Sequence, residues 1–182
     1  MDHVLLHGPP GLGKTYTVQR AAREHNVDLV MVQGATSLPA FVRKIAFAVY
    51  SHVVLNKSKK PMFVCVDDCD ELFSDKKNLN VMKGVMDNER NVLAYEVDMT
   101  NQIKAYRAAE SATTQLIADA MEYYQSQGGL GLEIPMEQVC FIVLSNKELA
   151  SEADSRAKPA KMHETAVRSR VNYRPINATG KE

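Results

Sequence analysis

Residues 3–15 read HVLLHGPPGLGKT, and this stretch decides the fold. Its apolar start, residues 4–6, is typical of a short buried strand. Gly8 then opens the pattern G-x-x-x-x-G-K-T, which ends at Thr15. The residues after it, YTVQRAAREH, are good helix formers without a helix breaker. The pattern therefore lies between a strand and a helix, which is the setting in which it binds phosphate.

The chemistry of this loop predicts a site for nucleotide phosphate. Glycines let the backbone turn its N–H groups inward, and the N-terminus of the following helix adds positive potential. The Lys14 ammonium can reach β- and γ-phosphates, and the Thr15 hydroxyl can ligate Mg²⁺. The alternative is a Gly/Pro-rich turn that binds nothing. We expect nucleotide contacts along the whole stretch of Gly8, Pro9, Pro10, Gly11, Leu12, Gly13, Lys14, Thr15 and Tyr16.

Composition limits the classes of protein to which the chain can belong. Its 182 residues suffice for one domain with a hydrophobic core. Lys plus Arg equal Asp plus Glu at 22 each, which argues against a polybasic nucleic-acid binder but leaves room for a local basic patch. Cys65, Cys69 and Cys140 lack metal-type spacing, so we interpret them as reduced thiols. We expect no membrane-spanning segment, no signal peptide and a cytoplasmic location.

Two acidic residues follow the buried-strand pattern MFVCV of residues 62–66. The carboxyl ends of strands in an open parallel sheet face the ligand crevice. Asp67 is then placed to hold Mg²⁺, directly or through water, and Asp68 to orient and deprotonate a water that attacks the γ-phosphate. The alternative is a strand-to-helix turn in which both acids act as helix caps.

A second polar site follows the strand pattern VCFIVL of residues 139–144. A neutral polar side chain at this strand end can hydrogen-bond the attacking water or a γ-phosphate oxygen, so Asn146 is a candidate catalytic residue. The alternative is a simple cap for the helix expected after it. Three arginines, Arg168, Arg170 and Arg174, come close together around a last short strand.

The rest of the chain predicts alternating helices and strands. Helices are expected at residues 16–25, 37–55 and 78–88, strands at 28–33 and from 171, and the start of a short helix at Asp70 and Glu71. Residues 91–97 suit a short strand or an extended loop, 100–127 a long and partly buried helix, and 128–135 a flexible loop. We interpret residues 100–135 as a surface insertion in preference to a recognition element.

In this order, the motifs resemble those of the AAA+ ATPase core. Residues 8–15 look like a Walker A motif, residues 63–68 like a Walker B motif, and Asn146 falls at the sensor-1 position. The RSR of residues 168–170 is similar to the Ser-Arg motif of clamp-loader subunits. The opening stretch is similar to the Holliday-junction branch-migration motor, and residues 67–87 to AAA+ ATPases encoded by phages and plasmids. The resemblance covers roughly residues 3–174.

The resemblance implies an α/β fold of the P-loop NTPase type, with a five-stranded parallel sheet flanked by helices. It implies one AAA+ core domain over residues 1–182 without the helical lid. It also implies ATP and Mg²⁺ as ligands, and a homo- or hetero-oligomeric ring. In such a ring Arg170 of one subunit, or its rival Arg168, completes the ATP site of the next subunit.

Several departures from the family pattern bear on function. Asp68 stands where the family usually has glutamate, and its carboxylate is one methylene shorter. The segment that usually precedes the first strand, and the lid with its sensor-2 arginine, are not in the chain. The GATSLPAF of residues 34–41 lacks the aromatic-apolar-glycine element of protein-threading unfoldases, which argues against peptide translocation.

Two functions agree with these residues. The first is an ATP-hydrolysing motor or switch that remodels a nucleic-acid or protein complex in DNA replication or recombination, with DNA or a DNA-bound protein as its client. The second is a nucleotide-dependent assembly or binding module with slow or no hydrolysis, which Asp68 keeps open. A small P-loop kinase is disfavoured, because it leaves Asn146 and the C-terminal arginines without a role.

Overall fold

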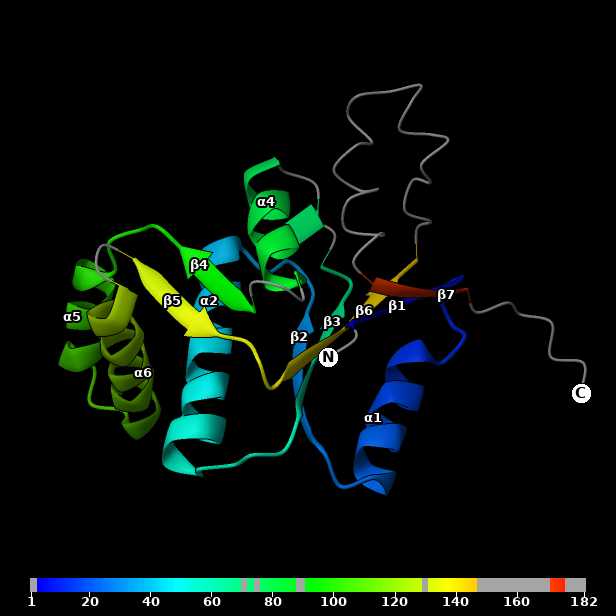
Figure 1. The fold of residues 1–182 in the computed structure, drawn as a ribbon, viewed down its shortest axis with the longest axis horizontal. Helices are drawn as coiled ribbons and strands as arrows, with labels where there is room; N and C mark the ends of the chain where they lie inside the picture. Colours follow the sequence, from blue (N-terminus) through cyan, green and yellow to red (C-terminus); the bar gives the residue numbers. More distant parts are fainter. Residues whose placement is uncertain are drawn as a thin grey trace, which may run out of the picture.

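Five parallel strands form the central sheet, in the order β2–β3–β6–β1–β7 (Figure 1). The structure is a computed structural model that describes residues 3–69, 72–73, 76–87, 91–128, 131–146 and 171–175. The α/β fold with a five-stranded parallel sheet is therefore confirmed. The strands are β1 His3–His7, β2 Asp28–Gln33, β3 Met62–Asp67, β6 Val139–Ser145 and β7 Val171–Pro175.

The register of the sheet brings the carboxyl ends of four strands to one level. Gln33 is paired with Asp67, Asp67 with Leu144, and Ser145 with His7. All the strand pairs of this sheet run parallel, so these ends share one edge. Residues that follow different strands, and lie far apart in the chain, can therefore meet there.

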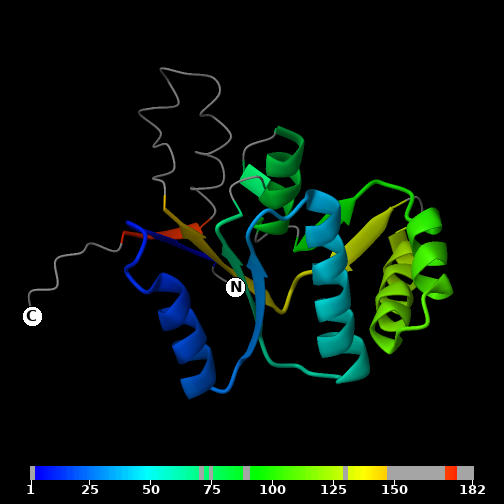
Figure 2. The ribbon, with the colours of Figure 1, turned by 180° about the vertical axis from the view of Figure 1, so that it is seen from behind.

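Helices cover the sheet on both faces. Helix α1, Lys14–Glu24, lies on one face, whereas α2, Leu38–Val49, and α4, Lys76–Val85, lie on the other. Figure 2 shows β2 between α1 and α2. Side chains alternate along β3, since Cys65 packs with Val18 of α1 while Val64 joins the core cluster that contains Phe41 of α2.

Helix α2 is apolar around most of its circumference. It continues into the π-helical segment η1, Tyr50–Leu55, which confirms a continuous helix as far as the predicted end. By length and composition the described helix Leu38–Leu55 could cross a membrane, although we expected no such segment. It packs against α6 on one side and shares a core cluster with Val64 of β3 on another, which favours many apolar residues. Its buried residues are Phe41, Val42, Ile45, Ala46 and Val49.

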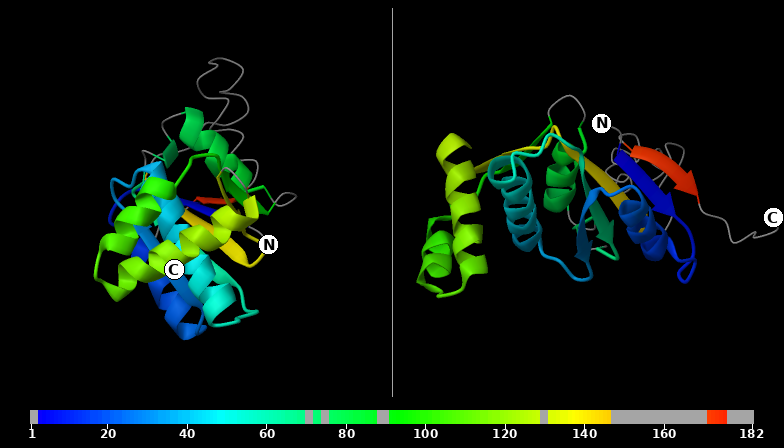
Figure 3. Two further views of the ribbon diagram at one scale, coloured as in Figure 1. Left: turned by 90° about the vertical axis from the view of Figure 1, so that its left-hand side faces the viewer. Right: turned by 90° about the horizontal axis from the view of Figure 1, so that it is seen from below.

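An outer layer extends the molecule beyond α2. We use this name for β4 Val92–Tyr95, α5 Thr100–Ala108, α6 Ala112–Gly128 and β5 Leu132–Pro135. Figure 3 shows α5 and α6 on the side of α2 that faces away from the sheet. Met121 and Tyr124 of α6 are buried in the same core cluster as Phe41 of α2. The insertion is therefore packed into the domain and is more than a surface addition.

The prediction of one long helix over residues 100–127 is wrong. The backbone of Ala109 is extended, with ψ 131°, and this residue separates α5 from α6. Glu110 lies in the break, which explains why it interrupts the apolar stripe expected for a single helix. Asp98 helps to start α5, because its carboxylate accepts hydrogen bonds from the backbone N–H and the hydroxyl of Thr100.

The prediction of a flexible loop over residues 128–135 is also wrong. Leu132–Pro135 form β5, which pairs antiparallel with β4. Leu132 and Ile134 are buried while Glu133 is exposed, so this short strand follows the alternation of a half-buried sheet. Its partner β4 confirms the extended structure expected within residues 91–97.

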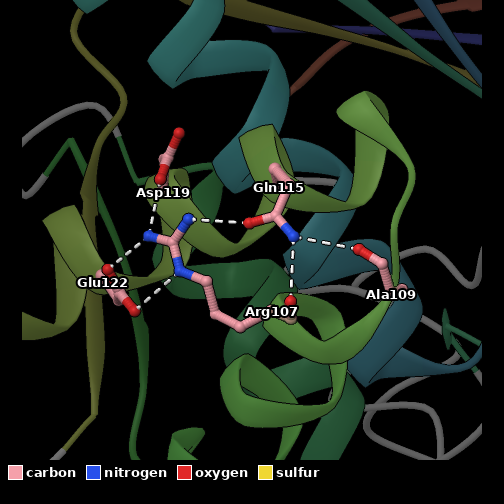
Figure 4. Close-up of polar contacts among 5 residues, drawn as sticks. All are labelled: Arg107, Ala109, Gln115, Asp119 and Glu122. Carbon is pink, nitrogen blue, oxygen red and sulfur yellow. Dashed lines mark hydrogen bonds and ion pairs between the residues drawn. The ribbon is translucent and has the colours of Figure 1, made fainter.

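An arginine on α5 links the two helices of the outer layer (Figure 4). Arg107 forms ion pairs of 2.6 Å with both Asp119 and Glu122 of α6, and donates to Gln115 Oε1 at 3.1 Å. Hydrogen bonds to the two carboxylates raise the pKa of Arg107 above its usual range. The Gln115 amide donates in turn to the carbonyls of Arg107 and Ala109. The same cluster therefore stabilises the backbone where the chain turns from α5 to α6.

A substitution at Gly131 tests the packing of the outer layer. A Cβ at this position would lie 2.4 Å from the Tyr95 carbonyl oxygen and 2.9 Å from Glu96 Cα. We expect Gly131→Ala to lower the free energy of unfolding by about 1–3 kcal/mol, because backbone has to move. Urea unfolding followed by circular dichroism measures this change.

Gly84→Ala is the matched control. This glycine is in α4, and a Cβ there meets nothing within 4 Å. The substitution should raise the free energy of unfolding by about 0.5–1 kcal/mol, because alanine is the better helix former. Equal effects at the two positions would contradict the close approach of Gly131 to β4.

Candidate functional site

The loop between β1 and α1 has the backbone that its glycines predict. Gly11 and Gly13 have φ values of 81° and 72°, in the left-handed region that favours glycine. The Gly8 N–H donates to the Ser145 carbonyl at 3.2 Å and so ties the loop to β6. Tyr16 follows in the first turn of α1 and is 60% exposed. The loop thus brings the N-terminus of α1 to the edge where the strands end.

Lys14 is the buried cation of the site, only 7% exposed. Its ammonium donates to the carbonyl oxygens of Gly8 at 2.7 Å and Pro9 at 2.9 Å, and to Asn146 Oδ1 at 2.8 Å. An ammonium has three N–H donors, and these three acceptors use all of them. The structure therefore brings together two residues predicted for the site, Lys14 and Asn146, from opposite ends of the chain.

The predicted magnesium ligands are also in contact. The Thr15 hydroxyl donates to Asp67 Oδ2 at 2.6 Å, although the two residues belong to α1 and β3. Asp67 is buried at the end of β3. A hydroxyl and a carboxylate at this distance can both reach one small cation.

Gln33 is a site residue that the sequence analysis missed. It ends β2, and its Nε2 donates to Asp67 Oδ2 at 3.4 Å, the same oxygen that accepts from Thr15. The available signal was its place as the last residue of the strand before Gly34. The strand-end argument that selected Asp67 and Asn146 applies equally to Gln33 once β2 is known to pair with β3.

Asp68 and Asn146 form the second polar contact of the site. Asn146 Nδ2 donates to Asp68 Oδ1 at 2.8 Å. Asp68 has a φ of 53°, which is uncommon for a residue with a side chain. This backbone turns the chain immediately after β3, and the carboxylate of Asp68 reaches the end of β6.

The donor set fits a nucleoside triphosphate with Mg²⁺. Mg²⁺ prefers oxygen ligands, and in nucleotide sites it takes one or two from the protein and others from phosphates and water. Thr15 and Asp67 would supply the protein oxygens, and Lys14 with the N-terminus of α1 would bind the phosphates. Within the described residues no three His, Cys, Asp or Glu side chains cluster as a metal site.

Some predicted residues lie outside the described part of the chain. These are Arg168 and Arg170, and also Asp70 and Glu71. Arg174 falls within β7, which lies beside β1 in the sheet.

The three cysteines are buried thiols without a disulfide, and all lie within the described residues. Burial, and to a lesser extent the neighbouring Asp67 carboxylate, together raise the pKa of Cys65 on β3 to about 12. Burial also raises the pKa of Cys69. Because the thiolate is the reactive form, these two thiols are protected chemically as well as sterically.

Alkylation tests this environment. At pH 8, iodoacetamide should modify Cys65 and Cys69 of the folded chain much more slowly than the same residues in urea, where the thiols return to their ordinary pKa. Peptide mass spectrometry measures each rate. Equal rates with and without urea would contradict the burial of these thiols beside the site.

Comparison with known proteins agrees with the geometry. The profile of the family described as "ATPase family associated with various cellular activities (AAA)" matches residues 4–158. The chain is 38% identical over 71 residues to a proteasome-activating nucleotidase from Methanococcus vannielii, and 33% identical over 69 residues to one from Methanocaldococcus jannaschii. It is 59% identical over 34 residues to the Holliday junction branch migration complex subunit RuvB from Orientia tsutsugamushi.

These alignments cover limited parts of both partners. They span 39%, 38% and 19% of this chain, and 17%, 16% and 10% of the respective relatives. The chain thus matches about a sixth of the length of the nucleotidases, and the similarity is limited to one segment of each protein. The family profile, in contrast, spans most of the 182 residues, and on this basis the chain belongs to the AAA family of ATPases.

Proposed function

We propose that the chain binds ATP with Mg²⁺ and hydrolyses it to ADP and phosphate. The observation that carries this proposal is the 2.6 Å contact between Thr15 and Asp67, which joins the phosphate loop to the acidic end of β3. Lys14 would bind the β- and γ-phosphates, and the loop from Gly8 to Tyr16 would surround the nucleotide. Bound Mg²⁺ would neutralise phosphate charge, with Thr15 and Asp67 as its protein ligands.

Asp68 and Asn146 would act on the water. The Asp68 carboxylate would orient the water and accept its proton, while the Asn146 amide would hydrogen-bond the water or a γ-phosphate oxygen. Their 2.8 Å contact supports a shared task, because it places both polar groups at one edge of the sheet.

The active form would be a homo- or hetero-oligomeric ring. Arg170 would enter the site of the neighbouring subunit and stabilise charge on the transferred phosphoryl group, with Arg168 as its rival. This part of the proposal rests on the resemblance of residues 168–170 to the Ser-Arg motif.

The hydrolysis would drive a motor or switch that remodels a nucleic-acid or protein complex. A relative named for Holliday junction branch migration supports a role in DNA replication or recombination, with DNA or a DNA-bound protein as client. The nucleotidases are named for activating a proteasome, but residues 34–41 lack the element expected for threading peptides. We place this function in the cytoplasm, of a bacterium or of the host cell if a phage encodes the chain.

A second function is favoured by Asp68. Its carboxylate is one methylene shorter than the glutamate of the family, and its positive φ partly determines where that carboxylate can lie. The chain would then be a nucleotide-dependent assembly module that hydrolyses ATP slowly or not at all. This module would bind ATP tightly and release no phosphate at any protein concentration.

ATPase rate as a function of protein concentration separates the two functions. For the motor, phosphate release per subunit should rise steeply with concentration, because each site needs a neighbour. Lys14→Ala should abolish nucleotide binding, and Arg170→Ala should lower the rate at saturation by about 10³-fold or more while binding persists. Arg168→Ala is the matched control and should have the smaller effect.

Three outcomes would change this assignment. A rate per subunit that is independent of protein concentration would contradict the proposed ring. A larger loss in Arg168→Ala than in Arg170→Ala would exchange their roles. Phosphate transferred to an added small-molecule acceptor would indicate a kinase.

A further inference from the structure

The buried ammonium of Lys14 has no donor left for another ligand. Its three hydrogen bonds go to Gly8, Pro9 and Asn146, at distances of 2.7–2.9 Å. Phosphate oxygens are charged and accept stronger hydrogen bonds than amide oxygens do. Lys14 can therefore bind phosphate only by giving up some of the contacts that it makes here.

Asn146 is the one of these three acceptors that is also linked to the proposed hydrolytic acid. Its Oδ1 accepts from Lys14 at 2.8 Å, and its Nδ2 donates to Asp68 Oδ1 at 2.8 Å. An amide group is planar, so the two contacts together hold its orientation. A single side chain thus connects the phosphate-binding cation with the acid expected to act on water.

We propose that Asn146 is a latch that competes with phosphate for the Lys14 ammonium. Once phosphate has displaced it from Lys14, Asn146 releases Asp68. When Lys14 donates to phosphate, Asn146 loses one of the two contacts that orient its amide. Its hold on Asp68 weakens, and the carboxylate becomes available for water. The proposal rests on the function proposed above, and adds that Asn146 opposes nucleotide binding before it assists hydrolysis.

ADP is the probe that isolates the latch. It has a β-phosphate for Lys14 but no γ-phosphate that Asn146 could contact, so the amide cannot contribute a favourable contact of its own there. Asn146→Ala should therefore bind ADP about three- to tenfold more tightly than the wild type, the range for one ordinary hydrogen bond, because Asn146 is exposed and its contact with Lys14 is partly hydrated. Isothermal titration calorimetry measures the affinity directly.

Two further variants serve as controls. Asn101→Ala removes an exposed asparagine from α5 in the outer layer, and should leave the affinity for ADP unchanged. In Asn146→Ser the serine side chain is too short to connect Lys14 with Asp68, so this variant should tighten ADP binding as Asn146→Ala does. Thermal unfolding of each variant establishes that it is folded before it is titrated.

A double-mutant cycle tests the link to Asp68. Removing the Asp68 charge also favours ADP by electrostatics, and comparing the single variants with the double variant separates this effect from the coupling between Asp68 and Asn146. If the amide is held on Lys14 partly by Asp68, Asn146→Ala should gain less affinity in the Asp68→Ala background than in the wild type. Equal gains in both backgrounds would overturn the link.

The outcomes distinguish this proposal from the proposed function. If the wild type binds ADP, Lys14→Ala does not, and Asn146→Ala is unchanged or weaker, the latch is wrong and nucleotide binding stands. If the wild type binds neither ADP nor ATP, both proposals fail.

Discussion

The hydrogen bond between Thr15 and Asp67 depends on the order of strands in the sheet. Thr15 lies in the helix that follows β1, and Asp67 is the last residue of β3. These two strands are not neighbours, because β6 lies between them. The contact is possible only because the parallel strands end at one level, so that the start of α1 reaches across the end of β6. Asn146 follows this intervening strand, and its position explains why it touches both Lys14 and Asp68.

The outer layer changes the environment of α2. The helix would otherwise expose one side to water, but α6 covers it and the helix becomes part of a core that continues from the sheet to Met121 and Tyr124. Such burial favours apolar residues on the two sides of the helix that are covered. A sequence pattern that resembles a membrane span is thus a product of packing between two protein layers.

The central sheet could be predicted because its strands carry strong local signals. Residues 62–66 and 139–144 are continuous apolar runs followed by polar residues, and the phosphate loop identifies the end of β1. The outer layer gave weaker signals. Residues 100–127 have helix formers throughout, and the contacts of Arg107 with Asp119 and Glu122 across the break at Ala109 are not visible in this pattern. The strand β5 has four residues and follows glycines, so composition favoured a loop.

The site was predictable to the extent that it follows strand ends. Apolar runs are followed closely by Asp67, Asp68 and Asn146. Gln33, in contrast, ends a less hydrophobic strand, and only its pairing with Asp67 identifies it as a site residue. The contact between Asn146 and Lys14 could not be predicted, because the spacing of residues does not say which acceptor an ammonium chooses.

The antiparallel pairing of β4 with β5 also has a consequence for how the chain folds. Between β3 and β6 the chain runs from residue 67 to residue 139, and it must return before these two strands can pair. The Met136 N–H donates to the Asn91 carbonyl at 2.7 Å, so the segment that forms the outer layer begins and ends at the same place. Once β4 and β5 have paired, the search for the β3–β6 contact involves a much shorter effective loop, and its closure costs less chain entropy.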